Sequence, residues 1–213
     1  MLVGIFGYLG SGKTLLLTAL MNYLKNLSVI VTNYHTIFSD HIMNAEEMIL
    51  RIAEFKPIGT KIHRVFGIDE LGTILKALEF YSDENEMLTD IARKSRKLDT
   101  DIYYTTQSLM MVDRNIRRIT DVLIHVTYNN EAKQVNLQPY SFDGLNIIPD
   151  EPLILQETEY YFNLYDTNEV IEANKTAVLK FFVTKCENNA ELQDTLSTRS
   201  IRDVRGTHTR HKL

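Results

Sequence analysis

Cysteine and long apolar runs are the most informative absences from this sequence. The single cysteine, Cys186, cannot form an internal disulfide and has no Cys/His cluster around it, which is consistent with a reducing compartment. No apolar run reaches the length of a membrane-spanning helix, and the first predicted strand starts at Met1 without room for a signal peptide. We therefore expect an intracellular protein without a transmembrane segment.

An excess of positive charge is also missing. The sequence has 23 Lys and Arg against 28 Asp and Glu, a formal net charge of −5. This balance excludes a uniformly basic nucleic-acid-binding surface, but it leaves room for local basic patches. Basic runs occur at 93–97 and 114–118, and residues 199–213 form a basic tail that is short of large apolar side chains. No internal repeat or low-complexity segment is present.

The sequence G-Y-L-G-S-G-K-T at residues 7–14 follows an apolar run at 2–6 and precedes an apolar stretch at 15–24. Its spacing, G-x-x-x-x-G-K-[ST], is that of a phosphate-binding loop, or Walker A motif. Backbone N–H groups of such a loop face phosphate oxygens, its Lys reaches the β- and γ-phosphates, and its hydroxyl holds Mg²⁺. Gly7, Gly10 and Gly12 permit positive φ angles and close approach of the ligand. The predicted nucleotide-binding residues are Gly7, Gly10, Ser11, Gly12, Lys13, Thr14 and Leu15.

Residues 64–70, R-V-F-G-I-D-E, read as an apolar strand that ends in two adjacent carboxylates. Taken alone, this pattern is more often a strand end followed by a solvated turn. After a Walker A motif we interpret it as a Walker B motif, in which Asp69 holds the Mg²⁺ hydration shell together with Thr14. Glu70 is then the predicted general base that polarises the attacking water.

Further apolar, β-branched runs at 28–32, 101–106 and 121–128 indicate buried parallel strands of a doubly wound α/β sheet. Gln107 follows the strand at 101–106, and the carboxyl ends of parallel strands form the ligand edge of such a sheet. If this strand lies between the two Walker strands, Gln107 can touch the γ-phosphate or the attacking water. Otherwise it caps a loop.

We predict a single P-loop domain over 1–198, with a core at 1–130. An extension at 131–165 is expected to form antiparallel strands, because its β-like runs are short and are broken by Pro149 and Pro152. A helical region follows at 166–198, and the tail at 199–213 is expected to be flexible, either merely solvated or binding phosphates or an acidic partner. Further helices are predicted at 45–55, 71–81, 85–98 and 169–182, and a loop at 113–118.

The motifs G-Y-L-G-S-G-K-T, V-I-V-T-N, F-G-I-D-E, A-R-K-S-R-K-L-D-T-D-I-Y-Y-T-T-Q and V-D-R-N-I-R-R-I-T-D-V-L-I together resemble the HerA/FtsK superfamily of P-loop ATPases. The likeness is strongest to its viral members: the zonula occludens toxin-like assembly ATPases of filamentous phages, and the genome-packaging ATPases of membrane-containing and archaeal viruses. It covers the core and a later element, N-L-Y-D-T-N-E at 163–169.

This resemblance implies a three-layer P-loop NTPase of the additional-strand, catalytic-glutamate type, with strand order 5-1-4-3-2. It implies an enzyme that hydrolyses ATP with Mg²⁺ between the subunits of a homo-oligomeric, hexameric ring and moves DNA without sequence preference. Lys13, Glu70 and Gln107 carry over as catalytic residues, and Thr14 and Asp69 as metal-binding residues. The arginine finger does not carry over cleanly. Plausible positions are Arg93, Arg96, Arg114, Arg117 and Arg118, of which Arg96 and Arg117 are our candidates.

The viral likeness further implies genome packaging or virion assembly, with a capsid or membrane protein as a partner, in the host cytoplasm or in the virion. Phage assembly proteins of this group usually carry a transmembrane helix, and the cellular translocases carry large additional domains. This sequence shows neither, which favours a compact packaging or translocation motor.

Two other functions stay open at this stage. A P-loop kinase uses the same loop, but it needs acceptor-site and lid arginines and no catalytic Glu after the Walker B Asp. A nucleotide-dependent assembly switch would bind ATP, oligomerise and recruit partners through the acidic region 143–172 without moving DNA. The basic runs at 93–97 and 114–118 are compatible with DNA contact or with an arginine finger, and the first of them also with a solvated helix face.

Overall fold

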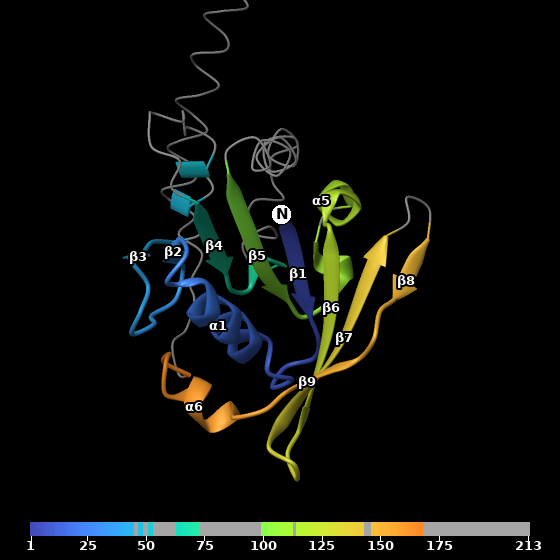
Figure 1. Ribbon diagram of the computed structural model, residues 1–213. Coiled ribbons are helices and arrows are strands. Elements are labelled where there is room, and N and C mark those ends of the chain that lie inside the picture. The colour runs from blue at the N-terminus through green and yellow to red at the C-terminus, as the bar shows by residue number, and fades with distance from the viewer. Residues whose placement is uncertain are drawn as a thin grey trace, which may run out of the picture. The chain divides into compact units, whose positions relative to one another are not determined.

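A computed structural model describes residues 1–44, 47–48, 51–52, 63–72, 99–112, 114–142 and 146–167 of the chain (Figure 1). The predicted helices at 85–98 and 169–182, the basic run at 93–97 with Arg96, and the tail at 199–213 lie outside these residues. So do most residues of the predicted helices at 45–55 and 71–81. The described parts of those two ranges, 47–48, 51–52 and 71–72, are helical.

Six strands form the parallel part of a mixed sheet: β1 (Leu2–Phe6), β2 (Val29–Thr32), β3 (His41–Ile42), β4 (Arg64–Ile68), β5 (Thr100–Thr106) and β6 (Val122–Asn129). They lie side by side in the order β3-β2-β4-β5-β1-β6. Without the two-residue β3, this is the order 5-1-4-3-2 that the resemblance implies. The strand before Gln107, β5, therefore lies between the two Walker strands β1 and β4, as the assignment of Gln107 requires.

Helix α1 (Lys13–Leu24) packs against one face of this sheet (Figure 1). Its sequence is apolar nearly all round, and Leu15, Leu17 and Met21 are fully buried in one cluster with side chains of β1, β2 and β4. Each such side chain contributes roughly 1.5–3 kcal/mol by leaving water. This packing fixes the helix, and with it the loop that precedes the helix. None of the helices in the described part of the chain has the length and apolar content needed to cross a bilayer.

Three antiparallel strands extend the sheet beyond β6, as predicted for 131–165. They are β7 (Gln134–Phe142), β8 (Ile147–Pro149) and β9 (Leu153–Leu155). β7 pairs with β6, and both β8 and β9 pair with β7. Pro149 ends β8 and Pro152 precedes β9, positions on an outer strand where a missing N–H leaves no inner ladder bond unmade.

Two predicted details of local structure are wrong. Residues Arg114–Ile119, predicted within a loop, form the short helix α5, because the buried Ile116 supplies an apolar anchor that the run of arginines hides in the sequence. It follows a 3₁₀ turn, η1 (Leu109–Met111). Residues Thr158–Phe162, predicted among antiparallel strands, form helix α6, whose Thr158 hydroxyl donates a hydrogen bond to the Lys133 carbonyl at 2.8 Å.

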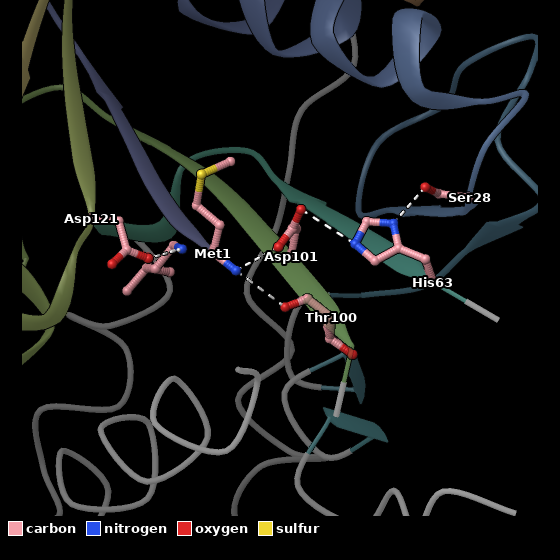
Figure 2. A network of polar contacts seen from close by, with 7 residues as sticks. Met1, Ser28, His63, Thr100, Asp101 and Asp121 are labelled. Atoms are coloured by element: carbon pink, nitrogen blue, oxygen red, sulfur yellow. Dashed lines mark hydrogen bonds and ion pairs between the residues drawn. The ribbon is translucent and has the colours of Figure 1, made fainter. Parts of the chain in front are cut away.

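A polar network joins the amino-terminal ends of three adjacent strands (Figure 2). His63, directly before β4, accepts or donates a 2.6 Å hydrogen bond between its Nδ1 and the Ser28 hydroxyl, directly before β2. Its Nε2 lies 3.3 Å from the Asp101 carboxylate in β5. Asp101 also binds the Met1 amino group. Because parallel strands start side by side, one imidazole can bridge both neighbours at the edge opposite the phosphate-binding loop.

We expect His63→Ala to lower the free energy of unfolding by about 1–2 kcal/mol, the value of two partly exposed polar contacts. Nucleotide affinity should not change, since the network lies at the opposite edge of the sheet. Denaturant titration and a nucleotide-binding assay measure the two quantities, with Ser28→Ala as a control that removes only one contact. Full stability of His63→Ala, or a loss of nucleotide binding, contradicts this role.

Candidate active site

The phosphate-binding loop connects β1 to α1 at the carboxyl edge of the parallel strands (Figure 1). Gly10 and Gly12 have φ angles of +73° and +89°, a region that glycine enters without strain. Gly7 does not have a positive φ, so its expected conformational role is not observed. It is needed for space, because a Cβ there would lie 2.5 Å from the Val126 carbonyl oxygen and 2.6 Å from the Ser11 hydroxyl.

Lys13 is buried at the start of α1, and its Nζ donates a 3.0 Å hydrogen bond to the Tyr8 carbonyl within the loop. Burial lowers the pKa of Lys13, and the carboxylates of Glu70 and Asp69 oppose that shift. The ammonium is thus held between the loop and two anions. Such a group is available to a bound polyphosphate without crossing bulk water.

Asp69 directly follows β4 and is only 6% exposed. The Thr14 hydroxyl lies 3.0 and 3.2 Å from its two carboxylate oxygens, and the Thr105 hydroxyl donates a 2.5 Å hydrogen bond to Oδ1. Burial raises the pKa of this carboxyl, and the two hydroxyls and the Lys13 charge act against the rise. The structure therefore brings together the two predicted metal-binding residues, Thr14 and Asp69.

Glu70 follows Asp69 with a φ of +55°, uncommon for a side-chain-bearing residue. Its backbone N–H donates to the Thr105 hydroxyl at 2.8 Å. Burial first, and then the Asp69 carboxylate, raise the pKa of Glu70, whereas Lys13 and a hydrogen bond from the Gln107 side chain lower it. The Glu70 Oε2 atom is buried and has no hydrogen-bond partner among the described residues. The structure thus places Gln107 against the predicted base.

Asn33 and Thr105 belong to this site, and the sequence analysis gave neither a role. Asn33, 8% exposed at the end of β2, donates from Nδ2 to the Asp69 carbonyl at 2.9 Å and accepts the Asp69 N–H at 2.7 Å. Its amide therefore holds the backbone of Asp69 at both polar groups. The only signal in the sequence was position, since Asn33 and Thr105 stand where neighbouring parallel strands end.

The candidate arginines are not assembled in the same way. Arg117, in α5, has its Nη1 3.8 Å from the Met110 sulfur, and its Nε is buried without a hydrogen-bond partner among the described residues. Arg114 and Arg118 are exposed on the same helix. Arg96 lies outside the described residues. None of the described arginines is among the groups that shift the pKa of Asp69 or Glu70.

The residues present fit a nucleoside triphosphate with Mg²⁺. The loop has a glycine where a Cβ would collide with backbone and two glycines with positive φ, and its Ser11 hydroxyl is buried without a partner in the described part of the chain. A hydroxyl beside a carboxylate is the oxygen donor set that Mg²⁺ prefers when phosphates and water complete its shell. The Leu15 side chain is fully buried, so only its backbone is available to a ligand.

Comparisons with known proteins agree with this arrangement. The family model described as "ATPase family associated with various cellular activities (AAA)" matches residues 3–128. No curated protein sequence matches the chain significantly. Among solved structures, the fold is similar to the N-terminal domain of zonular occludens toxin from Neisseria meningitidis, at 16% identity and a TM-score of 0.55, over 78% of this chain and 98% of that one.

Two further solved structures share the fold at low identity. One is another ATPase domain, 11% identical with a TM-score of 0.51, over 78% of this chain and 84% of that one. The genome-packaging NTPase B204 from Sulfolobus turreted icosahedral virus 2, in complex with AMPPCP, is 13% identical with a TM-score of 0.49, over 71% and 97%. The α/β P-loop fold with a mainly parallel sheet and antiparallel C-terminal strands is therefore established.

Replacing Asn33 with alanine should lower the free energy of unfolding by about 2 kcal/mol or more, because both backbone polar groups of the buried Asp69 lose their partner. We also expect weaker Mg²⁺-dependent nucleotide binding. Asn22→Ala is the matched control, since Asn22 makes only an exposed side-chain hydrogen bond to Lys25. Chemical denaturation and titration with a fluorescent ATP analogue test both effects. An Asn33→Ala variant as stable as Asn22→Ala would refute the role.

Proposed function

Because the chain belongs to the family of ATPases associated with various cellular activities, we propose that it hydrolyses ATP to ADP and phosphate with Mg²⁺. The observation that carries this proposal is the Glu70 carboxylate. One of its oxygens is engaged by Gln107, while Oε2 is buried and unpartnered among the described residues. A carboxylate with free lone pairs beside a phosphate-binding loop is suited to take a proton from an attacking water.

The other side chains divide the remaining work. Lys13 supplies positive charge to the β- and γ-phosphates, and Thr14 and Asp69 hold Mg²⁺. Bound Mg²⁺ neutralises charge on the phosphate oxygens during transfer. Gln107 fixes the orientation of the Glu70 carboxylate and can donate a hydrogen bond near the γ-phosphate. A base paired in this way is directed at water, whereas a kinase takes its nucleophile from a separate acceptor substrate.

We further propose that the protein works as a homo-oligomeric, hexameric ring that moves DNA during viral genome packaging or virion assembly. The motif resemblance supports this motor function, as do the exposed basic residues Arg114 and Arg118 of α5, which suit sequence-independent phosphate contacts. A neighbouring subunit would contribute the arginine finger, for which Arg117 and Arg96 are the candidates. Loops at the carboxyl edge also expose large apolar side chains suited to a subunit contact: Tyr8, Leu9 and Met110, at 82%, 84% and 80%.

Glu70→Gln should bind ATP as wild type does, because the isosteric amide removes only the proton acceptor. Turnover should fall by about 10²-fold or more, the usual contribution of a general base. Steady-state phosphate release and binding of a fluorescent ATP analogue separate the two effects. Glu131→Gln, an exposed position in the turn between β6 and β7, is the matched control. Turnover at the wild-type rate in Glu70→Gln means that Glu70 is not the base.

The ATPase rate per subunit should rise with protein concentration and again on addition of DNA, because an arginine finger supplied by a neighbour is worth about 10³–10⁵ in rate. The measurement compares double-stranded and single-stranded DNA at several salt concentrations, and DNA affinity should fall steeply with salt. ATP-dependent oligomers without turnover or DNA stimulation would favour an assembly switch instead. A phosphorylated acceptor in place of free phosphate would favour a kinase.

A further inference from the structure

Residues Thr158–Tyr165, here called the strap, return from the antiparallel extension to the Walker B corner. The strap begins with α6, which packs against α1 (Figure 1). At its start, Thr158 is 1% exposed and bonded to the Lys133 carbonyl at the turn between β6 and β7. At its end, the Leu164 carbonyl accepts the Ile37 N–H at 3.0 Å, and Tyr165 forms an antiparallel bridge with Thr36. Both ends of the strap are therefore attached.

Tyr165 brings the strap against Tyr34, which follows β2. Their rings meet edge to face, with centroids 6.3 Å apart and planes at 89°. Tyr34 is 2% exposed and its hydroxyl lies 3.2 Å from the Thr18 hydroxyl in α1. The Thr18 hydroxyl donates its only proton to the Thr14 carbonyl at 2.8 Å, so the Tyr34 O–H is the donor in the contact with Thr18.

Packing alone does not account for this chain of contacts, since phenylalanine would fill the space of Tyr34 without a buried hydroxyl. The bonded hydroxyls reach the first turn of α1, where a helix has the fewest intrahelical bonds. Thr14, whose hydroxyl faces Asp69, stands in that turn. Burial, and then the Asp69 charge, raise the pKa of Tyr165 to about 12, which places this phenol within electrostatic reach of the Walker B carboxylate.

We propose that Tyr34 and Tyr165 are positioning residues for the metal–nucleotide site. The strap holds the Tyr165 ring against Tyr34, and Tyr34 acts through Thr18 to fix the turn that presents the Thr14 hydroxyl to Asp69. The inference rests on the proposed function, in which Thr14 and Asp69 hold Mg²⁺. It adds that the C-terminal extension of the domain supports the metal site and is not only an edge of the sheet.

The test compares the Mg²⁺ concentration that gives half-maximal ATP turnover with the affinity for a fluorescent ATP analogue in EDTA. Tyr34→Phe and Tyr165→Ala should each raise the half-maximal Mg²⁺ concentration by about fivefold, the value of one lost hydrogen bond. Affinity in EDTA should stay at the wild-type level. Tyr165→Phe keeps the ring and should behave as wild type. Tyr23→Ala is the matched control, since Tyr23 is 78% exposed on α1.

A second variant covers the case in which Tyr165→Ala does not fold. The chain contains no tryptophan, so Tyr165→Trp introduces a single fluorophore into the strap. Its emission should change on addition of ATP with Mg²⁺, but not of ATP with EDTA. Absence of that change, while the same sample binds the fluorescent analogue, overturns the inference.

The outcomes separate the two proposals. Normal Mg²⁺ dependence in both Tyr34→Phe and Tyr165→Ala overturns the inference and leaves the ATPase assignment standing. Equal losses with and without Mg²⁺ also overturn it, because they indicate a general structural defect. If the wild-type chain shows no Mg²⁺-dependent binding or turnover of ATP, the proposed function fails, and the positioning role fails with it.

Discussion

The site depends on a buried carboxylate. Burying the ionised Asp69 would cost several kcal/mol without partners, so its surroundings must supply them. They do so from three elements: the Thr14 hydroxyl of α1, the Thr105 hydroxyl of β5, and the Asn33 amide after β2, which binds the backbone of Asp69. Because each partner stands where a strand ends or a helix begins, the parallel sheet itself sets the geometry. The same residues would orient the carboxylate for a metal ion.

Much of the fold could be predicted from local pattern. The Walker A spacing fixed the loop and α1, and apolar β-branched runs located β1, β2, β4, β5 and β6 to within a residue or two. Pro149 and Pro152 correctly indicated antiparallel edge strands. Thr14, Asp69, Glu70 and Gln107 were brought together as predicted, because the carboxyl ends of neighbouring parallel strands converge. Their catalytic roles stay predictions.

What the sequence could not provide depends on contacts between distant segments. Asn33 and Thr105 are ordinary polar residues until β2 and β5 are placed on either side of β4. Helix α5 was missed because one buried isoleucine among arginines gives no clear periodicity, and α6 because its five residues are too few to show one. The positive φ expected for Gly7 was wrong, since the constraint at that position is the nearby Val126 carbonyl and not the backbone conformation.

The central claim is that Asp69 and Glu70 have different tasks, one toward the metal ion and one toward water. A crystal structure with Mg²⁺ and a non-hydrolysable ATP analogue tests it most directly. The account predicts Mg²⁺ at the Thr14 hydroxyl with Asp69 in its coordination or hydration shell, and Glu70 Oε2 hydrogen-bonded to a water facing the γ-phosphate. Mg²⁺ bound away from Thr14 and Asp69, or a Glu70 carboxylate turned away from the γ-phosphate, would contradict the account.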